Sequence, residues 1–356
     1  MNSTVMHERP GVYSSYDASS AISGGTAKKV IGVAARAAKG EANRAVRITS
    51  YTAGVSAFGE DNESSAMEGL LRLLYQNGAA AVAAVAVAAP ADKQDYEAAF
   101  AALSAQEDVS VVVCDSADTE VLQALRDSVT AASGARRERI AVAGSEEETV
   151  SAMIEQAEAL NSERVVLLGG RALDSGGEML SGPAAAAAVA AVIAATADPA
   201  IPLNGAPLEG ISGVAADFSD DEIDLLVRGG VTPLEGNAGI ASPVRGVTTR
   251  TTTGGASDST WRELSTVLIV DNVIPQIRSA LRRTFNRAKN TAQTRSAVRS
   301  RVIVELENKR QAEIIDGYGD VTVRASEENA TVCEVEFSFA VAHGLNQIYL
   351  TAHITI

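Results

Sequence analysis

The chain has 356 residues, of which 46% are apolar and 21% are charged, and its formal net charge is −15. So large an apolar fraction excludes a disordered chain, and the length suits two or three domains, because single cores rarely grow beyond about 250–300 residues. The acidity argues against a general DNA-coating protein. No apolar run is long enough to predict a membrane span, and the first residues lack the pattern of a secretory signal.

The N-terminal third begins with a polar arm. Residues 1–25 are rich in Gly and Ser around a short extended stretch. This composition predicts an arm without a hydrophobic core of its own. Strands are predicted over residues 29–35, 45–51 and 80–89, the last of which is a continuous Ala/Val run closed by a proline. Residues 67–76 carry apolar side chains at helical spacing and are followed by Asn-Gly, a signal for a helix end.

A regular alternation of short apolar runs and amphipathic segments follows. It predicts βαβ units and a mainly parallel sheet, because parallel strands need helical crossovers. The predicted strands are residues 109–114, 139–143 and 164–168, and the predicted helices are residues 119–132 and 146–160.

The middle of the chain, residues 181–270, combines one Ala-rich helix with a long loop-rich stretch. Ser-Gly-Pro at 181–183 opens an Ala-rich helix over residues 184–197, with Pro in its first turn. Residues 199–260 are rich in loops, with one helix at 219–228 whose acidic residues lie at its N-terminus, where the helix dipole favours them. The Thr/Gly/Ser run at 248–259 predicts a turn or a boundary, and residues 264–270 read as another strand.

The segment 272–304 differs in charge from everything else. It contains eight basic and no acidic residues, which leaves −23 on the rest of the chain. Its apolar residues fall on one face of a helix, with Arg278, Arg282 and Lys289 as a neighbouring stripe and Arg283 and Arg287 on the opposite face. A second helix is predicted from residue 293 to about 310. Three interpretations of this basic segment are open. A solvated helix face would be expected to carry acidic residues as well, and nucleic-acid binding would be expected to have aromatic residues nearby. Docking onto an acidic protein surface is therefore favoured.

The C-terminal part predicts antiparallel strands at residues 321–325, 331–341 and 347–356. In the last of these, apolar and polar residues alternate to the end of the chain. Most termini fray, so a strand that ends in this way is expected to dock somewhere. The residues on its apolar face are Ile348, Leu350, Ala352, Ile354 and Ile356.

Signals for catalysis or metal binding are weak. The sequence has no P-loop, HExxH or CxxC motif, and His7, His343 and His353 all lie in or beside the terminal strands. Gly169-Gly170 follows a strand and indicates either a phosphate site or a tight turn. The two cysteines, at 114 and 333, are interpreted as buried reduced thiols. We therefore expect no cofactor and no metal.

An ordered set of motifs resembles the contractile tail sheath proteins of bacteriophages and phage-tail-like (R-type) bacteriocins. Pro10-Gly-Val-Tyr13 resembles the PGVY opening of that family, and Ala57-Phe-Gly59 resembles part of its first folded segment. Ser181-Gly-Pro183 with the Ala-rich helix resembles the family's stretch before its long loop region. Leu225–Gly230 with Val231-Thr-Pro233 resembles its later sequence of a helix, a glycine and a hydrophobic-x-Pro motif. The basic helix pair and the final strands match its C-terminal domain, so the resemblance covers nearly the whole chain.

The resemblance implies a structural subunit and not an enzyme. The implied fold is α/β, or α+β overall: an outer parallel-sheet domain at 26–255, a tube-proximal domain with antiparallel strands at 256–343, an N-terminal arm at 1–25 and a C-terminal donor strand at 344–356. Donor residues at the N-terminal end would be Val5, Pro10, Gly11, Val12 and Tyr13. The basic helix residues Arg278, Arg282, Arg283, Arg287 and Lys289 would face the tube.

The same resemblance implies the partners. The subunit would polymerise as stacked, hexameric rings around an inner tail tube protein and would meet baseplate and tail terminator proteins, with no nucleic acid and no direct membrane insertion. It would belong to a phage tail or tail-like particle assembled in the host cytoplasm, and contraction would drive the tube through a target envelope. The residues leave two alternatives open: an α/β enzyme or small-molecule-binding protein with a site near Gly169-Gly170, and another self-assembling shell or tube component.

Overall fold

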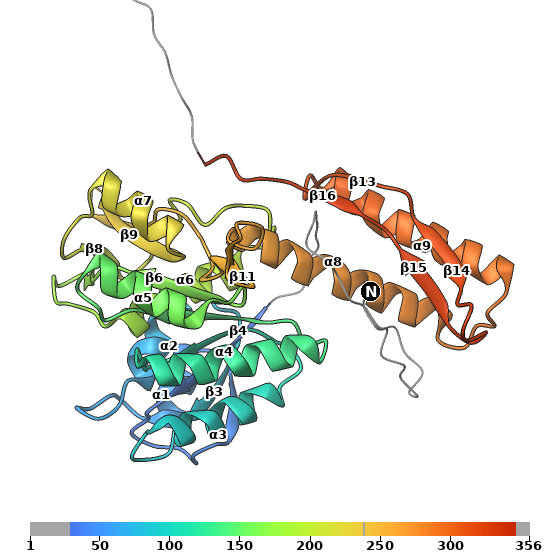
Figure 1. Cartoon of the computed structure of the whole chain (residues 1–356). Coiled ribbons are helices and arrows are strands. Elements are labelled where there is room, and N and C mark those ends of the chain that lie inside the picture. Colours follow the sequence, from blue (N-terminus) through green and yellow to red (C-terminus); the bar gives the residue numbers. More distant parts are fainter. Residues whose placement is uncertain (1–28, 238, 347–356) are drawn as a thin grey trace, which may run out of the picture. The chain divides into compact units, whose positions relative to one another are not determined.

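A computed structural model of the chain describes residues 29–237 and 239–346 (Figure 1). These residues form two compact units. The larger, here called the α/β unit, contains residues 29–197, 201–267 and 344–346. The smaller, here called the small unit, contains residues 198–200 and 268–343. Both predicted donor segments, residues 1–25 and 347–356, lie outside the described residues.

The α/β unit is built on an eight-stranded sheet with the order β10-β9-β6-β5-β4-β1-β3-β2. The six inner strands run parallel, and the edge strands β2 and β10 are antiparallel to their neighbours. The inner strands are almost continuously apolar because helices cover both faces. This confirms the predicted parallel α/β fold. The strands are β1 (Val30–Ala35), β2 (Ala45–Ile48), β3 (Val82–Ala86), β4 (Val109–Cys114), β5 (Ile140–Gly144), β6 (Val165–Gly169), β9 (Val231–Asn237) and β10 (Ile240–Pro243).

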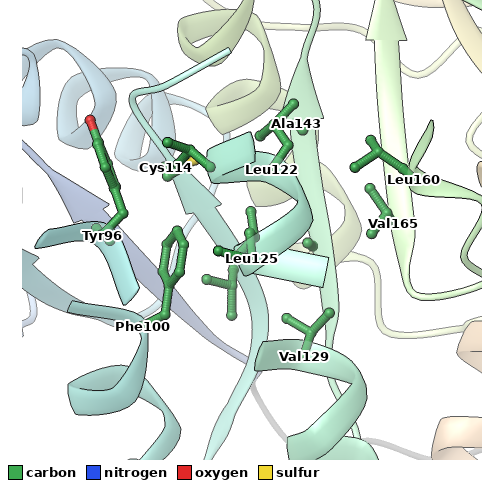
Figure 2. Close-up of a cluster of buried hydrophobic side chains, with 14 of the residues drawn as sticks. Tyr96, Phe100, Cys114, Leu122, Leu125, Val129, Ala143, Leu160 and Val165 are labelled. Atoms are coloured by element: carbon green, nitrogen blue, oxygen red, sulfur yellow. The ribbon is translucent and has the colours of Figure 1, made fainter. Parts of the chain in front are cut away.

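One face of the sheet is covered by α3 (Lys93–Ser104), α4 (Thr119–Gly134), α5 (Val150–Leu160) and α7 (Asp220–Arg228). Their apolar side chains interdigitate with those of the strands, as Figure 2 shows for Phe100, Leu122, Leu125 and Val129. Each such side chain contributes about 1.5–3 kcal/mol of burial free energy, so this layer is the main stabilising core.

The other face is covered by α6 (Gly182–Ala195) and α2 (Met67–Gln76), with α1 (Tyr51–Phe58) packed on α2. Helix α6 begins at the N-cap Ser181, whose hydroxyl accepts a hydrogen bond from the Ala184 N–H, and has Pro in its first turn. All but two of its residues are buried, because Ala side chains allow it to lie close to β4, β5 and α2 at the same time.

The loop-rich middle of the chain contains two short ribbons. Strands β7 (Ala172–Asp174) and β8 (Ile211–Val214) pair antiparallel. Strands β11 (Thr252–Thr253) and β12 (Ala256–Ser257) form a hairpin inside the predicted turn, with two glycines of positive φ at its tip. The Asn161 side chain accepts the Thr251 and Thr252 N–H groups and so holds the base of this hairpin.

The small unit contains most of one long helix, all of a second, and an antiparallel ribbon that is two strands wide. Helix α8 (Leu264–Phe285) is followed by α9 (Ala292–Gln311), as predicted for residues 293–310. The prediction of a strand at 264–270 is wrong, because these residues form the first turns of α8. The β-branched residues there suggested a strand, but buried positions continue at helical spacing through Leu264, Val267, Val270, Ile274 and Ile277.

The ribbon joins β13 (Ile315–Tyr318) to β16 (Phe339–Val341) and β14 (Thr322–Ala325) to β15 (Cys333–Glu336), all antiparallel. The Gly319 N–H donates to the Ser338 carbonyl at 2.8 Å and connects the two halves. Helix α9 lies against the ribbon: the Arg299 Nε donates to the Val321 carbonyl at 2.6 Å. The parallel-dominated sheet and the separate antiparallel ribbons confirm the predicted fold class.

Candidate assembly surfaces

Four exposed basic residues cluster at the end of α8 and in the loop after it. This basic cluster consists of Arg282, Arg283, Arg287 and Lys289. Within the described part of the chain, none of the four makes an ion pair or a side-chain hydrogen bond. Arg278, one turn earlier on α8, is only half-exposed and has a polar contact of its own.

The predicted basic stripe is wrong at its C-terminal end. Helix α8 ends at Phe285, so Arg287 and Lys289 lie in the loop and do not extend the helical row. A new helix begins at once, because the Thr291 hydroxyl caps α9 by accepting the Thr294 N–H. The Asn290 side chain donates to the Ala330 and Val332 carbonyls and holds this loop against the ribbon.

The remaining basic residues of the segment are used inside the small unit. Arg295 donates to Asn290, and Arg299 donates to the Val321 carbonyl. Arg301 forms a 2.5 Å ion pair with Glu305. The positive charge that remains available to a partner is therefore concentrated in the basic cluster, where it favours an acidic surface.

The ribbon presents strand edges that could be extended. It is only two strands wide among the residues that the structure describes, so the outer edges of β14 and β15 have no strand partner there. Its outer face is polar, with a 2.7 Å ion pair between Arg324 and Glu334. On the other face Val323 and Val335 pair across the strands and stay half-exposed. An added strand with one apolar face could satisfy the open edge and cover this surface.

The alternative site at Gly169-Gly170 has a structural explanation. A Cβ on Gly169 would lie 2.7 Å from the Val231 Cγ1 and 2.9 Å from the Met153 Sδ. Gly170 has a φ of +105°, which only glycine adopts easily. Close packing and a tight turn therefore account for both glycines. A cavity of about 460 Å³ lies elsewhere, between α3 and α4, where Phe100 and Arg137 help to line it.

The carboxyl edge of the sheet, where α/β enzymes build their sites, is filled at its centre. A Cβ on Gly144, at the end of β5, would lie 1.9 Å from the Gly182 carbonyl oxygen at the start of α6. Beside it the Asp115 carboxylate accepts from the Arg36 Nε at 2.7 Å and from the Tyr96 hydroxyl at 2.6 Å. Burial, ahead of the nearby Asp115 charge, raises the pKa of Tyr96, so this hydroxyl stays a neutral donor.

Other reactive groups give no assembled site. In the described ranges no group of three or more His, Cys, Asp or Glu side chains could hold a metal ion, and no helix is long and apolar enough to cross a membrane. Cys114 is buried, which raises its pKa to about 12. Cys333 is exposed, so its predicted burial is wrong.

Sequence reasoning found the basic segment but missed three features. It did not distinguish the four exposed residues of the basic cluster from Arg295, Arg299 and Arg301, which have partners within the small unit. It also missed the side chains of Asn290 and Asn161, which hold loops through backbone hydrogen bonds. The donor residues predicted at both chain ends stay predictions, because they lie outside the described residues.

Two family models match the chain: the phage tail sheath protein central domain over residues 89–248, and the phage tail sheath C-terminal domain over residues 256–355. The tail sheath protein of Bacillus phage SP01 is 30% identical over 224 residues, which cover 61% of this chain. The match spans only 38% of the length of that relative.

Solved structures share the fold over almost the whole chain. The helical sheath of the anti-feeding prophage in its contracted state has a TM-score of 0.73 and 18% identity, over 98% of this chain and 99% of that one. A sheath tail protein from Listeria innocua has a TM-score of 0.72 and 12% identity, over 90% and 93%.

Proposed function

This chain belongs to the phage tail sheath family, and from that premise we propose that it is a structural subunit of a contractile tail sheath. Copies would stack as rings, hexameric in our proposal, around an inner tube and between a baseplate and a terminator. Contraction would drive the tube through a target envelope. The place of action would be a phage tail or tail-like particle assembled in the host cytoplasm. The single observation that carries the proposal is the open two-stranded ribbon in a chain of this family.

Strand exchange would connect the copies. The alternating residues Ile348 to Ile356 would add to a ribbon edge of a neighbouring copy and place their apolar face beside Val323 and Val335. Burial of Ile348, Leu350, Ile354 and Ile356 would contribute roughly 6–12 kcal/mol. The conformational entropy lost when about nine backbone residues become ordered would oppose this gain by about 9–18 kcal/mol. One strand alone is therefore a weak joint, and several linked strands for each subunit are required.

The N-terminal residues Val5, Pro10, Gly11, Val12 and Tyr13 would supply the second donor segment. The division proposed for the chain is an arm at 1–25, an outer domain at 26–255, a tube-proximal domain at 256–343 and a donor strand at 344–356. Its support is that the ribbon and the basic cluster both lie in residues 268–343.

The basic cluster would face the tube. Its four exposed charges have no ion partner in the described structure, and the cluster lies in the C-terminal part of the chain together with the ribbon. Individual surface ion pairs contribute only about 0–1 kcal/mol. Such contacts suit a surface that has to release many subunits when the sheath contracts.

Electron microscopy of the purified chain tests the sheath proposal. We expect striated hollow cylinders from the full chain, and no cylinders from a chain that ends at Asn346. Thermal unfolding of the shortened chain should match that of the full chain, which separates lost assembly from lost folding. Long ordered cylinders from the shortened chain would refute strand exchange through residues 347–356.

The tube contact has a separate test. The double variant Arg282→Glu with Arg283→Glu, produced together with the tube protein, should form cylinders that contain no tube. The matched control is Arg44→Glu with Arg228→Glu, two exposed residues of the α/β unit with the same change in charge. Tube-filled cylinders from both variants would rule out the basic cluster as the tube-facing surface.

A further inference from the structure

The last described residues of the chain belong to the α/β unit. Strand β16 ends at Val341 in the small unit, but residues 344–346 are part of the α/β unit. A Cβ on Gly344 would lie 2.9 Å from the Pro202 Cβ, so the backbone there runs close against the 202–204 loop. The Asn346 Oδ1 accepts a hydrogen bond from the Asn204 Nδ2 at 2.7 Å.

Asn204 is itself held from the other side. Its Oδ1 accepts from the Gly246 N–H at 3.4 Å, so both polar atoms of the side-chain amide are engaged. The next residue, Gly205, has a φ of +67° and donates its N–H to the Pro243 carbonyl at 2.8 Å. The loop that carries Asn204 is therefore attached to the end of β10 by contacts that do not depend on the C-terminal segment.

We propose that Asn204 is a positioning residue for strand exchange: it pins residues 344–346 to the α/β unit of their own subunit and fixes the point from which residues 347–356 leave. This inference rests on the proposed sheath function. The pin would remain closed in the assembled sheath, so that exchange begins after Asn346. It would favour exchange because part of the segment is ordered before a neighbour is met, which reduces the ordering entropy lost on binding.

The pin also limits how far the donor can reach. Ten residues beyond Asn346 span at most about 33–36 Å when fully extended. The acceptor ribbon of a neighbouring copy must therefore have its edge within that distance of the pin. A short free tether also raises the effective concentration of the donor at that edge.

Chemical cross-linking tests which subunit holds the pin. In a Cys333→Ser background, Pro202→Cys and Leu345→Cys are combined, which leaves Asn204 and Asn346 in place beside them, and the chain is treated with a short bismaleimide before and after polymerisation. Cys114 is buried and serves as an unreactive internal thiol. We expect an intrachain link, seen on a denaturing gel as a monomer with one added linker mass, in free subunits and in cylinders alike. Each single-cysteine variant is the control.

Dimers and longer ladders from cylinders would overturn the inference, because the segment would then exchange before Asn346. Loss of the intrachain link on polymerisation would overturn it as well. Absence of cylinders from the unmodified chain would instead refute the sheath function, while the link in free subunits would still show that residues 344–346 lie against their own α/β unit.

Removal of the pin gives a second readout. Asn204→Ala should raise the subunit concentration needed for polymerisation about fivefold, the factor that corresponds to one net hydrogen bond of about 1 kcal/mol. Because Asn204→Ala also removes the acceptor of the Gly246 N–H, its thermal unfolding temperature should fall slightly. Asn346→Ala removes only the contact with Asn204 and should raise the threshold by the same factor with thermal unfolding unchanged, whereas a merely structural contact would change unfolding and not assembly. Asn308→Ala, at an exposed position of α9, is the matched control. An unchanged polymerisation threshold for Asn204→Ala would contradict the proposal.

Discussion

The contact between Gly144 and Gly182 decides whether the carboxyl edge of the sheet has room for a ligand. Alanine at 144 would place its Cβ 1.9 Å from a backbone carbonyl oxygen and 2.0 Å from the carbonyl carbon of Gly182. Neither atom can rotate away, so the start of α6 must move by about 1.5 Å or more to restore an ordinary contact. Because α6 is buried along almost its whole length, that movement disturbs its packing on β4, β5 and α2.

Overpacking of this kind typically destabilises by about 1–3 kcal/mol, and a clash with backbone on both sides belongs at the upper end. We expect Gly144→Ala to lower the free energy of unfolding of the α/β unit by about 3 kcal/mol. Urea unfolding followed by fluorescence measures this selectively, because the only tryptophan of the chain, Trp261, lies in that unit. The matched control is Gly134→Ala, since a Cβ at 134 meets no atom within 4 Å.

Gly134 is the last residue of α4, where alanine has the higher helix propensity and should stabilise by up to about 1 kcal/mol. Opposite signs for the two substitutions would support the close packing at Gly144. If Gly144→Ala unfolded within about 0.5 kcal/mol of the unmodified chain, α6 would not close this edge, and the small-molecule alternative would regain support.

Three further outcomes follow from single side chains. Asp115→Ala should destabilise by about 3 kcal/mol in urea unfolding, because the Tyr96 hydroxyl loses its buried acceptor and an ion pair is broken; a loss below 1 kcal/mol would contradict this. The Arg310 guanidinium, through its hydrogen bond, lowers the pKa of Glu307 to about 2. The ionised Glu307 carboxylate therefore stabilises the folded state above pH 4.5, and this contribution is lost as the pH falls toward 2. Glu307→Gln should therefore remove part of the acid-induced loss of helical circular dichroism in that range, and identical acid profiles would refute the assignment. A maleimide should label Cys333 in the native chain and Cys114 only after unfolding, as mass spectrometry would show; equal native labelling would contradict the burial.

The α/β fold could be predicted because its signals are local. Strand β4 has the predicted bounds 109–114, and α4 and α9 differ from prediction by one or two residues at their ends. Short apolar runs, helical periodicity and N-caps each act over a few residues, so the sequence displays them directly. The strand prediction at 264–270 failed because a β-branched run carries both a strand signal and part of a helical face. The wider period, which extends to Ile277, decides between them.

The assembly surfaces were only partly predictable, because they depend on contacts between distant residues. The charge of segment 272–304 is visible in the sequence, but the internal use of Arg299 depends on the Val321 carbonyl, 22 positions away. The open ribbon edge could not be predicted from strand patterns, since an edge is defined by the strand that is missing beside it. The contact between Asn204 and Asn346 spans 142 positions and has no local signature.

The charge distribution makes the two kinds of assembly contact respond differently to salt. Each copy carries a formal charge of −15, so identical copies repel one another over distances beyond direct contact. Salt screens this repulsion, with a Debye length of about 8 Å at 0.15 M, but hardly changes main-chain hydrogen bonds or apolar burial in exchanged strands. The basic cluster would meet an acidic tube through exposed charges, and salt weakens such pairs. Rising ionic strength should therefore favour polymerisation of the chain by itself and disfavour its docking on the tube. A common trend for both would mean that strand exchange and tube contact are not separate interactions.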